Sequence, residues 1–215
     1  MTLFHKKQSM KFVDIHTHNN NSDKSSSILN SNEYIAERAI SIGIHPWNID
    51  TTWKKLFATI KEQAHKENVR AIGECGIDKL KSPENIELQK EILKAHALLA
   101  EETRKTLIIH CVKGFDEIIA IHKAITPQQA WIIHGFRGKP QQAEQLVKAG
   151  LYISFGEHFN TESIKVTPME RLFIESDDSN TDIEDIYRRA ATAKGCTVAE
   201  LVAAVIHNAQ ICNLL

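Results

Sequence analysis

The fold of this chain is decided near its N-terminus, by the stretch Phe12-Val13-Asp14-Ile15-His16-Thr17-His18. The stretch predicts a short apolar strand that ends in two histidines. Successive side chains of a strand alternate between faces, so His16 and His18 share a face, with Cα atoms about 6.7 Å apart. Two imidazoles at this spacing can bind one metal ion. Asp14 falls on the same face, where its carboxylate could orient a ligand histidine.

Seven further segments have the composition of strands, and predicted helices separate most of them. The strands are expected over residues 27–30, 39–44, 69–73, 106–109, 130–133, 151–155 and 171–174. Several are continuous apolar runs, as strands of a parallel sheet covered on both faces require. Helices are expected over residues 51–67, 83–103, 115–125 and 140–150, with two more near the C-terminus. Eight strands in this alternation predict an α/β fold, a TIM-like (β/α)8 barrel that forms one domain over residues 1–215.

The composition is that of a globular protein with a full core. The chain has 215 residues, of which 42% are hydrophobic and 25% charged. Its formal net charge of −1 gives no global positive field, so an anionic substrate would need a local site. We see no signal peptide and no apolar run near the ~20 residues of a membrane span, which predicts a cytoplasmic protein with no membrane partner. A monomer is favoured, and the sequence indicates no protein partner.

Residues that can bind metal ions follow most of the predicted strands. They are His16, His18, His45, Glu74, His110, His134 and Asp177. Barrel active sites lie at the C-terminal ends of the strands. A core histidine is expected in mid-strand or on a helix face, as at His96, so this set predicts a metal site.

The number of candidate ligands exceeds what one tetrahedral ion needs, which predicts two divalent ions. Glu74 is the natural bridge, because a carboxylate can give one oxygen to each ion. Asp177 can bind a metal and accept the proton of an attacking water, so Asp177 and Glu74 are the predicted catalytic residues. Two-metal sites suit hydrolysis. The histidine-rich set favours zinc or another transition metal, with magnesium and manganese also open.

The order of the motifs carries a family resemblance. The motifs are Asp14-Ile-His16-Thr-His18, Gly43-Ile-His45-Pro46, Gly73-Glu74-Cys-Gly76-Ile-Asp78, Ile109-His110-Cys111, His134-Gly-Phe136-Arg-Gly138 and Glu175-Ser-Asp177. Over nearly its whole length the chain resembles TatD-type metal-dependent deoxyribonucleases. The resemblance implies a TIM barrel with two divalent metals that cleaves phosphodiester bonds, with DNA as the substrate partner.

Carried over position by position, the resemblance also implies a ligand scheme. His16 and His18 would bind one metal together with Asp177, and His110 and His134 would bind the second. Glu74 would bridge the two ions. His45 would lie near the substrate phosphate.

The chain departs from the family pattern in two regions. The segment between His18 and His45 is shorter than usual, so the barrel is expected to be shortened or distorted around the second strand and the first helix. Val112 stands where the family usually has arginine, with Lys113 next, and Arg137 stands where it usually has serine. Lys113 and Arg137 are therefore the predicted substrate-binding residues beside His45, and Arg137 is expected to replace the missing arginine at the phosphate.

Other functions stay open at this point. An amidohydrolase-like barrel could act on a small-molecule ester, amide or phosphoester, although many such barrels bridge their metals with a modified lysine rather than a residue like Glu74. A non-catalytic protein could keep metals for stability alone. Trp47 and Phe136 flank the predicted site and could stack on a base, with core packing equally expected for Phe136.

Overall fold

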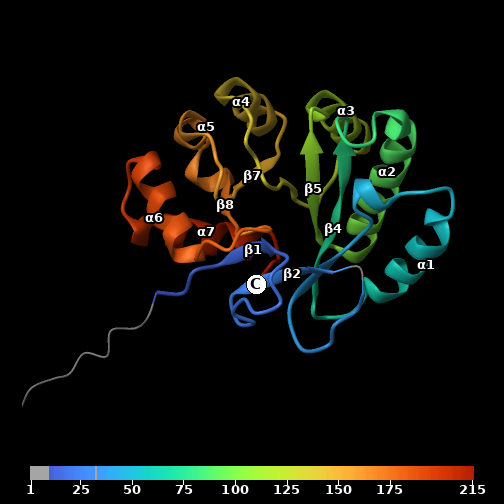
Figure 1. The fold of residues 1–215 in the computed structure, drawn as a ribbon, viewed down its shortest axis with the longest axis horizontal. Helices are drawn as coiled ribbons and strands as arrows, with labels where there is room; N and C mark the ends of the chain where they lie inside the picture. The colour runs from blue at the N-terminus through green and yellow to red at the C-terminus, as the bar shows by residue number, and fades with distance from the viewer. Residues whose placement is uncertain (1–9, 32) are drawn as a thin grey trace, which may run out of the picture.

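The computed structural model describes residues 10–31 and 33–215, and its strands form one sheet in the order β1 to β8 (Figure 1). The strands are β1 Asp14–Thr17, β2 Ser27–Ser31, β3 Ile40–Ile42, β4 Val69–Asp78, β5 Thr106–Val112, β6 Trp131–Ile133, β7 Tyr152–Phe155 and β8 Leu172–Ile174. Each strand pairs in parallel with the next. The predicted TIM-like barrel is therefore confirmed.

The sheet is nearly closed, because the segment after β8 returns to β1. The backbone N–H of Asp177 donates to the carbonyl of His16 at 3.0 Å, and the N–H of His18 donates to the carbonyl of Asp177 at 2.9 Å. These two bonds form an isolated parallel bridge between Thr17 and Asp177. The closure brings the first and the last predicted ligands of the chain together.

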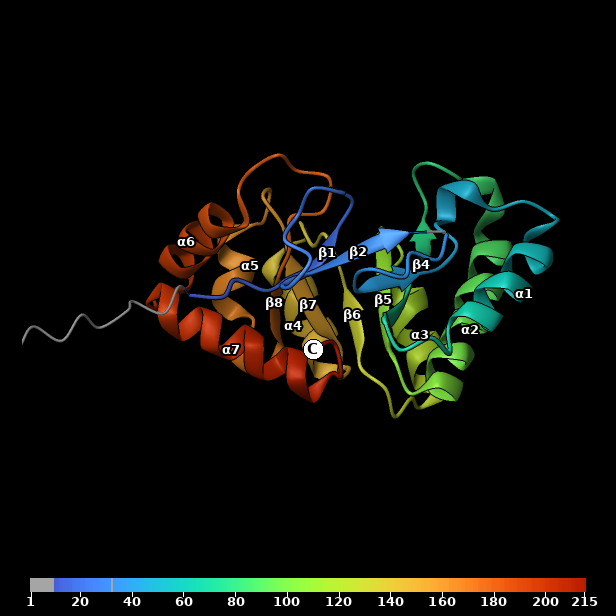
Figure 2. The same ribbon diagram turned by 90° about the horizontal axis from the view of Figure 1, so that it is seen from below.

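Helices cover the outside of the barrel from β3 onward (Figure 2). They are α1 Trp53–Gln63, α2 Ile86–Thr103, α3 Phe115–Ile125, α4 Pro140–Lys148, α5 Thr161–Val166, α6 Ile183–Lys194 and α7 Val198–Ile211. The sequence did not predict α5, whose six residues are too few to show a helical period. Within the described residues no single helix could cross a membrane; α6 and α7 pass that test only as a pair, bent by 105°.

The distortion predicted near the second strand takes a specific form. The second strand is present as β2, but among the described residues no helix connects β1 to β2 or β2 to β3. Arg38 lies in the connection from β2 to β3, and its side chain is only 6% exposed. Its guanidinium donates to the carbonyl of Asn20 and to the hydroxyls of Ser22 and Ser27 at 2.8–3.1 Å. One buried arginine thus ties together two loops that have no helix to support them.

The core is built from the apolar strand residues that the sequence singled out. The side chains of β6 and those of Leu107, Ile108 and Ile109 in β5 are at most 1% exposed. His96 on α2 is fully buried, and its Nε2 accepts the backbone N–H of Ile44 at 3.1 Å. Its predicted place in the core is confirmed, and it anchors the segment that leads into His45.

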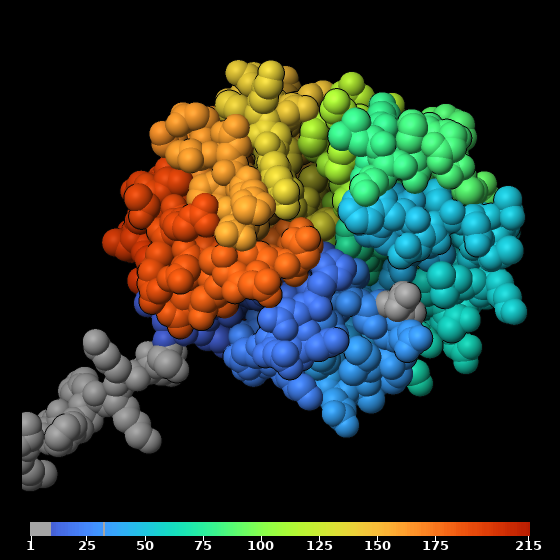
Figure 3. Space-filling model, viewed as in Figure 1, coloured from blue at the N-terminus to red at the C-terminus, as the bar shows by residue number. Residues whose placement is uncertain are grey.

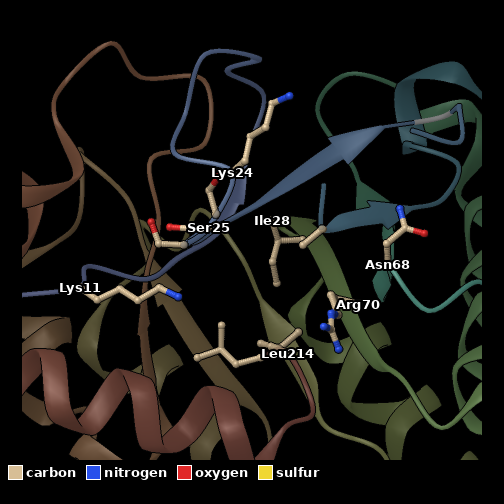
Figure 4. Close-up of a pocket in the computed structure, with 11 residues that line it drawn as sticks. Lys11, Lys24, Ser25, Ile28, Asn68, Arg70 and Leu214 are labelled. Atoms are coloured by element: carbon tan, nitrogen blue, oxygen red, sulfur yellow. The ribbon is translucent and has the colours of Figure 1, made fainter. Parts of the chain in front are cut away.

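A cavity of about 340 Å³ lies at the starts of the strands, away from the predicted ligands. Figure 4 shows Ile28 of β2 facing Leu214 across it, with Lys11 and Arg70 on opposite sides. Ile28 and Arg70 are each the second residue of their strand. In barrels this end of the sheet serves stability, whereas the opposite end carries the chemistry.

Candidate metal centre

Glu74 lies at the centre of a cluster formed by the C-terminal ends of the strands. It sits in β4 and is 2% exposed. The register between β4 and β5 shifts between Ile72 and Cys75. Glycines flank the shift because the backbones approach closely: a Cβ on Gly73 would lie 2.3 Å from the carbonyl oxygen of Ile108. The glycines on either side therefore let β4 pass close to its neighbour and present the Glu74 carboxylate inside the barrel. Figure 3 shows the face of the molecule on which the segments after β1 (blue) and β8 (orange) meet.

One oxygen of Glu74 faces the histidines of β1. Glu74 Oε2 lies 3.4 Å from His16 Nε2 and 3.5 Å from His18 Nε2. Asp177 Oδ1 lies 3.7 Å from each of the same two nitrogens. Two imidazoles and two carboxylates therefore surround one point, as predicted from the His-x-His pair and from the strand end that carries Asp177.

The other oxygen of Glu74 faces a different set of histidines. Glu74 Oε1 lies 2.8 Å from His134 Nε2, 2.9 Å from His110 Nδ1 and 3.0 Å from His45 Nε2. His45, for which the resemblance implied a position at the substrate phosphate, is thus as close to Glu74 as the two predicted ligands. Its side chain is 17% exposed, so it also borders the open side of the cluster.

Three polar residues that the sequence analysis did not assign support this cluster. Asn30 donates to Glu74 Oε2 at 3.4 Å and accepts the backbone N–H of Glu74 at 3.0 Å. Asp78 Oδ2 lies 3.2 Å from His110 Nε2, and Glu175 Oε1 lies 3.4 Å from His134 Nδ1. Carboxylates in this position fix the orientation of ligand imidazoles. A signal existed for Glu175, which directly follows an apolar strand, but Asn30 lies within a weakly predicted one.

The role predicted for Asp14 is wrong. Its carboxylate accepts the backbone N–H of Ser176 at 3.0 Å and the Ser176 hydroxyl at 2.6 Å, rather than orienting a histidine ring. Asp14 therefore joins β1 to the end of β8. Burial is the main cause that raises the pKa of Asp14 to about 7, against the hydrogen bonds from Ser176.

The donor set fits metal ions by two criteria. Three groups of ligand atoms lie within 4.8 Å of one another: His16 with His134 and Asp177, His16 with His18 and Glu74, and His45 with Glu74 and His110. All six predicted ligands belong to these groups. In addition, neither ring nitrogen of the fully buried His16 has a hydrogen-bond partner within residues 10–31 and 33–215. Buried polar atoms are normally paired, so this imidazole is available to bind a metal ion.

The electrostatics of the cluster favour an ionised Glu74. Burial opposes the charge, but His134, His110 and His16 outweigh it, and the pKa of Glu74 lies well below its usual value. The same pairing acts on His134: burial lowers its pKa, and the carboxylates of Glu74 and Glu175 raise it well above the ordinary value. The hydrogen bond to Glu74 raises the pKa of His18. The carboxylate of Glu74 is therefore ionised between the imidazoles, and its charge suits the binding of a cation.

The predicted substrate-binding residues lie on loops around the cluster. Lys113 follows β5 and Arg137 follows β6, and both are exposed. Neither has an ion-pair partner within residues 10–31 and 33–215. Phe136 is 2% exposed and packs in the core, whereas Trp47 is 52% exposed. Of the two aromatic residues considered for base stacking, only Trp47 is available.

The comparison with known families agrees with this arrangement. A family model described as "TatD related DNase" matches residues 2–212. The chain belongs to the TatD family. Solved structures of TatD proteins share its fold: a TatD homologue from Escherichia coli superposes with a TM-score of 0.81 at 18% identity, covering 96% of this chain and 99% of the homologue. A TatD family hydrolase from Entamoeba histolytica gives 0.75 at 16% identity, covering 95% and 98%.

Two curated relatives by sequence are named as a metal-dependent hydrolase and as a TatD exonuclease. The uncharacterized metal-dependent hydrolase YabD of Bacillus subtilis is 36% identical over 148 residues, which are 64% of this chain and 57% of YabD. A protein of Erwinia tasmaniensis named 3'-5' ssDNA/RNA exonuclease TatD is 28% identical over 145 residues, covering 63% of this chain and 56% of that protein. The match thus spans little more than half the length of these two curated relatives.

Proposed function

We propose that this chain is a divalent-metal-dependent phosphodiesterase that uses a two-metal site and acts on DNA. The observation that carries the proposal is the division of the Glu74 carboxylate: Oε2 faces His16 and His18, and Oε1 faces His45, His110 and His134. One carboxylate between two groups of imidazoles is suited to hold two adjacent ions. The family description and the name of the Erwinia relative support a nucleic-acid substrate.

The proposed roles follow from these contacts. His16, His18 and Asp177 would hold one ion, His110 and His134 the second, and Glu74 both. Bound divalent ions would lower the pKa of a water towards ~7 and stabilise negative charge on phosphate oxygens. Asp177, whose side chain is 20% exposed, borders the solvent and is suited to orient the attacking water and accept its proton. The water oxygen would bond to phosphorus as one bridging P–O bond breaks, and the proton that Asp177 accepts from the water would pass to the leaving oxygen.

The substrate phosphate would be bound by cations on the loops around the cluster. Arg137 and Lys113 are exposed and unpaired within the described residues, so their charges are available to an anion. A guanidinium can hold a phosphate through two hydrogen bonds, which makes Arg137 the stronger candidate. His45, at the open edge of the cluster, completes this set.

Labelled single-stranded DNA, RNA of the same sequence, and small ester and amide substrates test the proposal. The purified chain is stripped of metal and then supplied with Mg²⁺, Mn²⁺ or Zn²⁺. We expect cleavage of DNA only with metal, and its loss in Glu74→Gln but not in Glu144→Gln, a matched change at an exposed carboxylate of α4. Cleavage that survives chelation, or that survives in Glu74→Gln, would overturn it. Ester or amide cleavage without nuclease activity would favour an amidohydrolase-like enzyme.

A further inference from the structure

Trp47 is a large aromatic residue held in the open at the edge of the metal cluster. It lies in the short 3₁₀ turn Pro46–Asn48 directly after His45 and is 52% exposed. Its ring centroid lies 4.7 Å from that of His45 and 5.8 Å from that of His110. An indole this exposed has not been placed by burial, so its position must come from specific contacts.

Those contacts fix the indole firmly. Its Nε1–H donates to Asp78 Oδ2 at 2.7 Å. Asp78 is itself 1% exposed, and its Oδ1 accepts the backbone N–H groups of Leu80 and Lys81 at 2.8 and 2.9 Å. The backbone N–H of Trp47 donates to His45 Nδ1 at 3.0 Å. A rigid aromatic face beside a reaction centre costs little entropy to use in binding.

The side chain of Lys81 lies beside the Trp47 ring. The Lys81 ammonium lies 5.0 Å from the indole centroid. Lys81 has no carboxylate within 4.0 Å in the described part of the chain, whereas its neighbour Lys79 is paired with Glu117 at 2.5 Å. A base stacked on an aromatic side chain binds more strongly than an exposed ammonium held by a cation–π contact. A base can therefore displace the ammonium from the ring.

We infer that Trp47 and Lys81 form a nucleotide-binding subsite, in which the indole stacks on an unpaired base next to the cleaved phosphodiester. The displaced Lys81 ammonium then pairs with a phosphate of the same strand. This inference rests on the proposed function, since it names how that site holds its substrate. The ring lies next to two histidines of the cluster, so the stacked base belongs to a nucleotide adjoining the scissile bond. A paired base in a duplex has both faces covered and cannot stack in this way.

Binding of a short single-stranded oligonucleotide tests the inference, in comparison with an oligonucleotide of the same length that has an abasic terminal nucleotide. Affinity is measured in EDTA, where no hydrolysis occurs, and kcat/KM is measured separately with metal. We expect wild-type protein to prefer the base-containing oligonucleotide by about 5–150-fold. Trp47→Ala should abolish that preference, and Trp47→Phe, which keeps an aromatic face, should keep most of it. Each variant's metal content is measured to confirm that it folds.

Tryptophan emission gives a second readout. The chain has three tryptophans, and Trp53 and Trp131 are 7% and 1% exposed. A stacked base should therefore quench mainly Trp47, and the abasic oligonucleotide should quench much less. Lys81→Ala should weaken both oligonucleotides alike and reduce the salt dependence by about one phosphate contact, unlike the paired control Lys79→Ala.

Three results would overturn the inference: equal binding of the two oligonucleotides to wild type, an unchanged preference in Trp47→Ala, or equal losses in Trp47→Phe and Trp47→Ala. The third would mean that the indole acts only by holding Asp78. If the chain hydrolyses neither oligonucleotide while the binding preference is present, the proposed function fails and the subsite stands.

Discussion

Replacing Asp177 with asparagine removes a charge and a base from the metal cluster with little change in shape. The backbone of Asp177, and not its side chain, makes the two hydrogen bonds to the backbones of His16 and His18. Its φ of 56° lies in the left-handed region, which asparagine also adopts readily. We therefore expect the free energy of unfolding to change by no more than about 0.5 kcal/mol.

The catalytic effect should be much larger. Asp177 Oδ1 lies 3.7 Å from both His16 Nε2 and His18 Nε2, so it faces the same point as Glu74 Oε2. The loss of a general base costs about 10²–10⁴ in rate, equivalent to about 2.7–5.4 kcal/mol in the activation barrier. The assay is kcat on labelled single-stranded DNA at saturating substrate and metal, because the substitution also weakens one metal site.

Asp178→Asn is the matched control, since Asp178 is the next residue and is exposed. It should keep wild-type turnover. If Asp177→Asn also kept near-wild-type kcat, the proton acceptor would have to be sought elsewhere, with Glu74 next to be tested.

Three other substitutions test a buried histidine, a close approach of two strands and a surface cation. Burial lowers the pKa of His96 from 6.5 to about 4, so on acidification the unfolded chain binds a proton at this histidine before the folded chain does. The free energy of unfolding should therefore fall by about 3 kcal/mol between pH 6.5 and 4. Urea titrations of His96→Gln should show a smaller fall over the same range. A Cβ on Gly76 would lie 2.0 Å from the carbonyl oxygen of His110, so Gly76→Ala should lower the free energy of unfolding by more than about 2 kcal/mol. The control Gly195→Ala meets no atom within 4 Å and should lower it by about 1 kcal/mol. Arg137→Ala should weaken DNA binding and flatten its salt dependence by about one phosphate contact; unchanged affinity and slope would make Arg137 an ordinary surface charge.

Strand-end chemistry was the part of the site that the sequence could predict. An apolar run that ends in His110 or His134 predicts both a buried strand and the residue at its C-terminal end. A parallel barrel brings all such ends together on one side. The supporting contacts could not be predicted in the same way. Asn30 meets Glu74 because β2, β3 and β4 lie side by side in one sheet, and Asp14 contacts Ser176 where the barrel closes. Both depend on residues far apart in the chain, for which a linear pattern has no signal.

The helices show the same division. Periodic segments such as α3 were predicted to the residue, because a stripe of buried isoleucines marks each turn. The sequence predicted a distortion on either side of β2, but it did not predict that a buried arginine would link the two connections in place of helices. Arg38 has no motif around it, and its burial goes with three hydrogen bonds to residues that precede it by more than ten positions.

The number of metal ions bound per chain distinguishes a pair bridged by Glu74 from a single ion. Elemental analysis of the metal-loaded protein should give two divalent ions per wild-type chain and in the control Glu144→Gln. Glu74→Gln should lower occupancy at both sites, because each Glu74 oxygen faces a different group of histidines, whereas His16→Ala should lower it at one. One ion or none in the loaded wild-type protein, or two ions in Glu74→Gln, would contradict a carboxylate-bridged pair.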